Sequence, residues 1–440
     1  MERIRFIFRQ YLYDADRSLY VRPALMLLFL AVVAVALPYV EERSAVFRAI
    51  GRRLMWAVPD EPAAVQVVLG TIAGSVMTVV SIVYSVLIVA LSLASTQFSP
   101  RILAGFMRDR TSQRILGLFI GTFTYCLLVL RSTHSVPEPF VPTTSVFGAL
   151  FLALTCLGSL LFFVHHMANA IQANHIVDRI ASETEVVIDE ALPRQTIETK
   201  DVPSLPVSSD DNIVRATSSG YVQLVALEHL VSIARSAGVT LHIVRNIGQF
   251  VPQGGKLVVA SGRIDADTRA ACVNAFDLGA VRTMQEDFEF GIRQIVDIAL
   301  KAISPAVNDP STAVTCIDHL SRLLGRVAQR GDSEMVRRDE STGKILLVLP
   351  AHGFSRTLDL ALNQIRQYGK TDVAVLLRLT RALSDVADMT ENSAHLAAIS
   401  RHASMIRTVA APLSADDRLE LDRRLSVLFA RVGEPSKAAV

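Results

Sequence analysis

The sequence predicts an α-helical membrane protein with four transmembrane helices, joined to a cytoplasmic α+β domain that contains a small β-rich subdomain. Three observations support this fold class. No charged side chain occurs between Glu61 and Arg101, and an apolar run of that length is typical of a membrane-spanning helix. Three further long apolar segments lie within the first 170 residues. The rest of the chain alternates charged, helix-periodic stretches with short strand and turn patterns, as expected of a soluble domain.

The transmembrane domain is predicted at residues 23–170, with crossings at about 23–40, 65–95, 114–131 and 145–167. A cleaved signal peptide is the rival interpretation of the first crossing, but no A-x-A-type cleavage site follows it. The second crossing would extend about 45 Å from Val65 to Ala94, against a hydrocarbon core of about 30 Å. We therefore expect it to tilt or to project from the membrane. Residues 1–22 interleave arginine with apolar residues and are predicted to form an amphipathic N-terminal segment at the membrane surface.

Arginine counts in the short loops predict the orientation of these crossings. With the N-terminus inside, the inner segments hold nine arginines and the outer loops hold five. Basic residues favour the cytoplasmic side of a membrane. We therefore expect the N-terminus and everything after about residue 170 to lie in the cytoplasm.

The soluble part is predicted to follow the last crossing in four pieces. These are a helical linker at 171–202, the small β-rich domain at 203–263, a helical region with an Asn-Asp-Pro corner at 264–335, and short strands with C-terminal helices at 336–440. Ser414 and Asp417 fit a capping box at the start of the last helix. In the corner, Asp309 fits an N-cap and Pro310 a first helical position, where its missing N–H does no harm. Asn308, Asp309 and Pro310 are thus predicted to form a helix–corner–helix joint, with an ion or subunit contact as the functional alternative.

Small and hydroxyl-bearing residues recur at steps of seven along the second crossing. The members of this stripe, and its close neighbours, are Thr71, Gly74, Ser75, Thr78, Ser81, Ser85, Ser92 and Ser95. Seven residues are close to two helical turns, so these positions share one side of the helix. One interpretation is helix packing, because small residues let helices approach closely in lipid. The other is a pore, whose hydroxyl groups replace part of the water around a permeant ion.

Basic residues follow the stripe at the predicted cytoplasmic end. Ser99, Arg101, Arg108 and Arg110 are expected to ring the mouth of such a pore, where arginine would favour anions or gate the exit. Elsewhere, Glu286, Asp287 and Glu289 cluster near Arg282. We expect them to form an exposed acidic first turn, because negative charge suits a helix N-terminus, with a cation-binding carboxylate pair as the alternative.

Several functional classes are excluded or disfavoured by composition and motifs. The net charge of +2 argues against a nucleic-acid partner. The four cysteines are far apart in sequence, and His165 and His166 point apart on a helix, so neither a disulfide framework nor a metal site is predicted. No nucleophile elbow, phosphate loop, dinucleotide glycine run or H-E-x-x-H motif occurs. We therefore expect no enzyme activity and no cofactor.

Two long motifs carry a resemblance to a known family. They are STQFSPRIL with F-x-R-D-R-x-x-Q-x-x-L-G at 106–117, and ALKAISPAVNDPSTA at 299–313. In order and content they resemble bacterial membrane proteins of the "domain of unknown function 2254" family, over nearly the whole chain. The resemblance implies a bacterial inner (cytoplasmic) membrane protein with several crossings. It brings no catalytic residues and no established substrate.

The stripe leads to two hypotheses about function. The first is an oligomeric ion channel or channel-like pore in which the second crossing of each subunit lines a path for a small ion. The second is a membrane-anchored scaffold or sensor whose cytoplasmic domain binds a protein or a small ligand. In both, the expected partners are the lipid bilayer and further copies of the chain.

Overall fold

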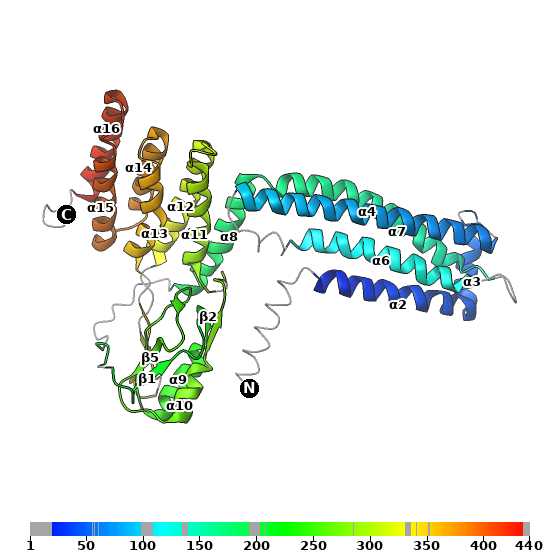
Figure 1. The fold of residues 1–440 in the computed structure, drawn as a ribbon, viewed down its shortest axis with the longest axis horizontal. Coiled ribbons are helices and arrows are strands. Elements are labelled where there is room, and N and C mark those ends of the chain that lie inside the picture. The colour runs from blue at the N-terminus through cyan, green and yellow to red at the C-terminus, as the bar shows by residue number, and fades with distance from the viewer. Residues whose placement is uncertain are drawn as a thin grey trace. The chain divides into compact units, whose positions relative to one another are not determined.

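The computed structural model describes residues 20–54, 56, 58–59, 61–97, 109–133, 140–192, 203–206, 208–284, 286–330, 336–339, 341–350 and 353–433, without the side chains of Arg48 and Gln97. These residues form two compact units, which divide between Gln172 and Ala173 (Figure 1). Most of the predicted N-terminal amphipathic segment, 1–22, lies outside the described residues.

The first unit is made of helices and holds four that are long and apolar enough to cross a membrane. These four are α2 (Val21–Arg43), α4 (Pro62–Gln97), α6 (Arg110–Ser132) and α7 (Thr143–Ala170), and a short helix, α3 (Ala45–Leu54), follows α2. The four apolar helices predicted from the sequence are therefore confirmed, although each extends beyond its predicted crossing by a few residues. We call this first unit the membrane unit.

The central helix of the membrane unit is α6, and α2, α4 and α7 pack around it. Of the most apolar stretch of α6, 56% is buried, compared with 22% for each of the other three. Close packing on α2 depends on two glycines. A Cβ at Gly121 would lie 2.5 Å from Leu30 Cδ1, and one at Gly117 would lie 3.0 Å from the backbone of Pro23.

The second unit, which we call the soluble unit, begins with α8 (Ala173–Ala191). The sequence predicts a linker over 171–202, but the buried face of α8 packs against α11 (Phe288–Ala302) and α12 (Pro310–Arg330). Arginines of α12 bind acids of α8 along this contact. Arg322 binds Glu185, and Arg326 and Arg330 both bind Asp189. This helix is thus a packed element of the soluble unit.

Two sheets follow in the soluble unit, one of five strands and one of three. The strands are β1 (Ile213–Arg215), β2 (Gly220–Val225), β3 (Leu241–Ile243), β4 (Phe250–Val251), β5 (Lys256–Ala260), β6 (Phe276–Gly279), β7 (Val336–Arg338) and β8 (Ile345–Val348). Their orders are β1-β5-β3-β8-β7 and β4-β2-β6, and the pairing of β3 with β8 is parallel. The sheets therefore take in strands well beyond the predicted 203–263, since β6, β7 and β8 complete them.

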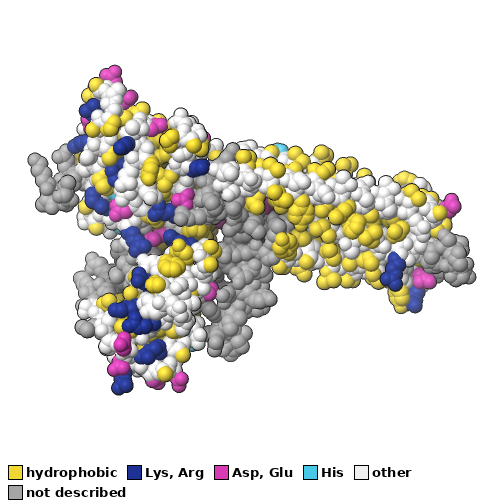
Figure 2. Space-filling model, in the orientation of Figure 1, with side chains coloured by type: hydrophobic (Ala, Val, Ile, Leu, Met, Phe, Trp, Pro, Cys, Tyr) yellow, Lys and Arg dark blue, Asp and Glu magenta, His cyan; other side chains and the backbone are white. Residues whose placement is uncertain are grey.

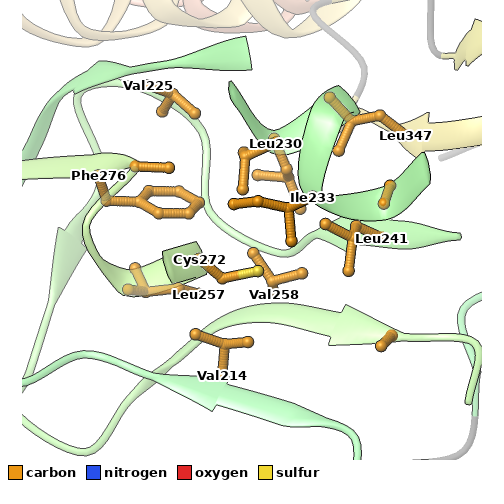
Figure 3. Close-up of a cluster of buried hydrophobic side chains, with 14 of the residues drawn as sticks. Val214, Val225, Leu230, Ile233, Leu241, Leu257, Val258, Cys272, Phe276 and Leu347 are labelled. Carbon is orange, nitrogen blue, oxygen red and sulfur yellow. The ribbon is translucent and has the colours of Figure 1, made fainter. Parts of the chain in front are cut away.

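The core of this β-rich part lies between the sheets and two helices, α9 (Leu227–Ala237) and α10 (Ala266–Val273). Leu230 and Ile233 of α9 point toward Leu241, Val258 and Cys272, as Figure 3 shows. Gly238 ends α9 in the left-handed conformation, with φ of +67°, which glycine adopts without strain.

Four more helices end the described chain: α13 (Phe354–Tyr368), α14 (Val373–Ala387), α15 (Ser393–Val409) and α16 (Ala415–Val432). Their starts carry side-chain caps at three of the four positions. Asp372 accepts from Val375, Asn392 from Ala394 and Ser414 from Asp417.

Candidate functional site

The predicted stripe lies on the outward face of α4, opposite the face that packs against α6 and α7. The buried positions of α4 are Val65, Leu69, Ala73, Val76, Val80, Val83, Ala90 and Ala94. Seven stripe positions are exposed in the single chain: Thr71, Gly74, Ser75, Thr78, Ser81, Ser85 and Ser92. Ser95 is half-buried. The structure therefore brings the stripe together on one surface, which we call the α4 outward face.

Four hydroxyl groups of this face donate hydrogen bonds within α4. Thr78 donates to the carbonyl of Gly74 at 3.1 Å, Ser81 to Met77 at 3.2 Å, and Ser85 to Ser81 at 2.9 Å. Thr71 bonds in the same way to Val67 at 2.7 Å. Because these donors are satisfied, they do not require a partner helix. Their oxygen atoms keep lone pairs that face away from the bundle.

Gly70 and Gly74 form a Gly-x-x-x-Gly pair on the same face. A Cβ built on either glycine would meet no atom within 4 Å. Such a pair in an apolar helix lets a second helix approach closely. The sequence analysis missed this pair because it considered only residues spaced by seven. The spacing of four between the two glycines is nevertheless visible in the sequence.

Outward faces of the other outer helices have a different composition. The exposed large apolar side chains of α2 are Val21, Leu25, Leu28, Phe29, Val32, Val35, Tyr39 and Val40, without a hydroxyl group other than that of tyrosine. On α7 the exposed face is largely leucine, phenylalanine and valine, with Thr155 and Gly158 among them. Apolar side chains cover much of the visible side of the membrane unit in Figure 2. Small polar residues are thus concentrated on α4.

The predicted basic mouth is described only in part. Ser99, Arg101 and Arg108 lie outside the described residues, and Arg110 is the first residue of α6. Next to it, Asp109 caps α6 by accepting from the backbone of Thr111 and Ser112. Its Oδ2 also lies 2.8 Å from Nε2 of His166 on α7. Burial raises the pKa of Asp109, but hydrogen bonds from Ser112 and His166 outweigh it and hold the pKa below its usual value.

The histidines at the end of α7 thus have separate contacts. His166 binds Asp109, which joins the N-terminus of α6 to the last turns of α7. His165 Nε2 lies 3.0 Å from Asn169 Nδ2 on its own helix.

A second acid, Glu41, caps a helix to which it does not belong. Pro142, the N-cap residue of α7, makes no side-chain cap. Instead Glu41 Oε1, from the last turn of α2, accepts from Thr144 N at 2.9 Å and Thr144 Oγ1 at 3.1 Å. The first N–H groups of a helix have no partner within it, and this absence is costly away from water. Sequence analysis did not single out Glu41, because no local pattern around residue 41 predicts a contact with residue 144.

Gly51 of α3 and Tyr125 of α6 close the surroundings of Glu41. A Cβ at Gly51 would lie 3.0 Å from Glu41 Oε1, so this position favours glycine. Tyr125, 2% exposed, donates from its hydroxyl to the carbonyl of Ser145 at 3.0 Å. We call this group of residues around the start of α7 the Glu41 cluster.

The Asn-Asp-Pro corner joins α11 to α12. Asn308 has φ of +51°, the one positive φ outside glycine among the described residues, and asparagine tolerates that conformation. Asp309 Oδ1 accepts from Thr312 N at 3.1 Å, and Pro310 begins α12. This geometry gives the three residues a structural role, as a sharp joint between α11 and α12.

The predicted exposed acidic turn at the start of α11 is instead buried. Asp287 caps α11, and its side chain is 3% exposed because Arg282 covers it with paired hydrogen bonds. Glu289 is paired with Arg356 of α13. The prediction was wrong here because Arg282 folds over the Asp287 carboxylate, and because Arg356, 67 residues further along the chain, pairs with Glu289.

These features define a multi-pass membrane protein with a folded soluble unit. The chain belongs to the family of predicted membrane proteins termed domain of unknown function 2254, whose sequence profile matches residues 16–385. The resemblance found in the two motifs is thereby confirmed. Similar relatives include uncharacterized proteins of Mycobacterium bovis and Mycobacterium tuberculosis, 33% identical over 359 residues, which cover 80% of this chain and 69% of each relative. No solved structure matches the chain.

Proposed function

We propose that the chain forms a homo-oligomer in the bacterial inner membrane and acts as an ion channel or channel-like pore. In this proposal the α4 outward face of each copy is turned toward the other copies, and the soluble unit is a cytoplasmic regulatory domain. The observation that carries it is the concentration of glycine, serine and threonine on the exposed side of α4.

The chemistry of this face favours a passive path for a small ion. The hydroxyl donors of Thr71, Thr78, Ser81 and Ser85 are bonded to α4 carbonyls, so these side chains offer their oxygen lone pairs. Oxygen atoms of this kind replace part of an ion's hydration shell. No Asp, Glu, Lys or Arg lies within α4, which argues against a proton relay or charge-coupled transport along it.

The open Gly70–Gly74 pair supports assembly through the same face. Close approach at the glycines would bring copies of α4 together near Gly74. The helix would then separate toward Ser92, where hydroxyl groups continue along the face. Assembly and conduction are separate parts of the proposal and are tested separately.

Cross-linking tests the assembly. In a background without the four native cysteines, Thr78→Cys should form disulfide-linked dimers in native membranes on mild oxidation. The matched control is Leu28→Cys, on the exposed face of α2, which should remain monomeric. Equal cross-linking at both positions, or none at Thr78, would contradict an α4 interface.

Ion flux into liposomes tests the pore. Thr78→Leu and Ser85→Leu each remove a hydroxyl group and add bulk, and we expect each to lower flux by about tenfold or more. Ile82→Leu, at an exposed position of the same helix, keeps volume and polarity and should leave flux near that of the wild type. Wild-type flux no greater than in empty liposomes would remove the pore.

The alternative is a membrane-anchored scaffold or sensor, and one observation favours it. Because four of the α4 hydroxyl groups donate to carbonyls of their own helix, they are able to face acyl chains with their donors paired. The membrane unit would then be an anchor, and the soluble unit would bind a protein or small ligand. Cross-linking of Thr78→Cys without wild-type flux would favour an oligomeric form of this alternative.

A further inference from the structure

The Glu41 cluster contains two buried oxygen atoms that the contacts described above leave without a partner. Glu41 is 4% exposed and Ser145 is 0% exposed. Among the described residues, neither Glu41 Oε2 nor Ser145 Oγ has a hydrogen-bond partner. The two residues are neighbours, because the backbone N–H of Ser145 also contacts the Glu41 carboxyl group. Buried polar atoms are rarely left unpaired, so both call for an explanation.

Among the side chains that the structure describes, ion pairing does not supply that explanation. The charged groups near the cluster that the structure describes are Glu42 and Arg43 on α2, Arg52 and Arg53 on α3, Glu61 before α4 and Arg131 on α6, and all are exposed. None of them forms an ion pair with Glu41, and Arg43 lies over the ring of Tyr39 at 3.8 Å. The titratable group facing the cluster from α6 is Tyr125, whose hydroxyl is bonded to the Ser145 carbonyl. On α7 the neighbouring side chains are uncharged.

A hydroxyl group such as that of Ser145 has the chemistry to serve both protonation states of a neighbouring carboxyl group. In the ionised state the Ser145 hydroxyl, after a rotation, donates to Oε2. In the neutral state a proton on Oε2 is donated to the Ser145 oxygen, because a hydroxyl group is both a donor and an acceptor. In either state Oε1 keeps its bonds from Thr144 N and Oγ1. The helix N-terminus favours the ionised form, whereas burial favours the neutral one.

We propose that Glu41 is a proton-binding site of the membrane unit, with Ser145 as the hydroxyl that serves both of its states. The proton comes from bulk water and binds Oε2, and no covalent bond other than O–H forms or breaks. Because Glu41 reaches from α2 to the start of α7, the proton is bound at the contact between two membrane helices. The site is independent of the α4 outward face and of whether that face conducts ions.

Infrared difference spectroscopy of the full-length protein in lipid tests this site. Spectra recorded between about pH 5 and about pH 9 should contain a C=O band of a buried carboxylic acid that appears on acidification. The band should be absent in Glu41→Gln and present in Glu42→Gln, a matched change at the adjacent exposed residue. Persistence of the band in Glu41→Gln, or no such band in the wild type, would overturn the proposal.

Ser145→Ala is a second variant, for the case in which Glu41→Gln does not fold. It retains the Thr144 contacts to Glu41 and removes the hydroxyl group. We expect the same band at a higher frequency, because the acid O–H loses its acceptor, and a shifted pH midpoint. An unchanged frequency and midpoint would show that Ser145 is not the partner of Glu41.

Discussion

His402 of α15 is buried in the soluble unit, with 1% of its side chain exposed. Its Nε2 lies 2.8 Å from Asp359 Oδ1 on α13, and Arg401 binds the same carboxylate at 3.0 Å. Burial lowers the pKa of His402 to about 4, although the bond to Asp359 opposes that change. The imidazole is therefore neutral in the folded protein and donates its Nε2–H to the carboxylate.

The buried neutral imidazole of His402 makes the stability of the soluble unit depend on pH. Between pH 6.5 and about 4 the unfolded chain binds a proton at His402 that the folded chain does not, so the free energy of unfolding rises with pH across this window. The loss of unfolding free energy between these two pH values is about 3 kcal/mol in total.

We expect amide exchange in α13 and α15 to accelerate as pH falls, after correction for intrinsic rates. His402→Gln should flatten this dependence, and His229→Gln, on α9, should keep it. Equal slopes in wild type and His402→Gln would show that His402 is not the group responsible.

At the scale of elements, α8 and α11 of the soluble unit pack closely at Gly291. A Cβ at Gly291 would lie 2.0 Å from Thr184 Oγ1 and 3.0 Å from Thr184 Cβ. Thr184 itself is fully buried and donates to the carbonyl of Ile180 at 2.6 Å, so it has little freedom to move. A residue larger than glycine therefore separates the two helices.

We expect Gly291→Ala to lower the free energy of unfolding by about 1–3 kcal/mol, the usual range for overpacking. Gly325→Ala, on α12, is the matched control. Its Cβ would meet the flexible Sδ of Met389 at 2.3 Å, so we expect a smaller loss. Thr184→Ala should recover part of the loss when combined with Gly291→Ala. Urea unfolding followed by pulse proteolysis measures all four variants, and additivity of the two changes would contradict the close contact.

The membrane helices were predictable from the sequence, but their order of burial was not. Long apolar runs identify a crossing because every backbone group must be satisfied within lipid. They do not show which helix is central, and α6 was not singled out. Gly117 and Gly121 of α6 leave room for the close approach of α2, and the Tyr125 hydroxyl group reaches the start of α7. Likewise, the sequence alone did not show that the stripe on α4 points outward, because this depends on the packing of the opposite face of α4 against α6 and α7.

The soluble elements show the same limit. Helix caps such as Ser414 depend on residues three positions away, so they could be predicted from the local sequence. The parallel pairing of β3 with β8 joins residues about a hundred positions apart, and no local pattern records it. Glu41 and Thr144 are also far apart in sequence, which explains why the Glu41 cluster was missed.

For the whole molecule, an even number of crossings places the two ends of the membrane unit on the same side. With the predicted orientation, Glu42, in the last turn of α2, faces outward, and Ser236 of the soluble unit faces the cytoplasm. In a background without native cysteines, Glu42→Cys should react with an impermeant maleimide in intact cells, and Ser236→Cys only after lysis. The reverse pattern would contradict the orientation.

The most direct test of the proposed pore is the arrangement of α4 in the purified full-length protein embedded in lipid nanodiscs, determined by electron cryomicroscopy. The account predicts a closed symmetric oligomer in which Thr78 and Ser85 of every copy face the symmetry axis. A single chain, or an oligomer in which these side chains contact only acyl chains, would contradict it.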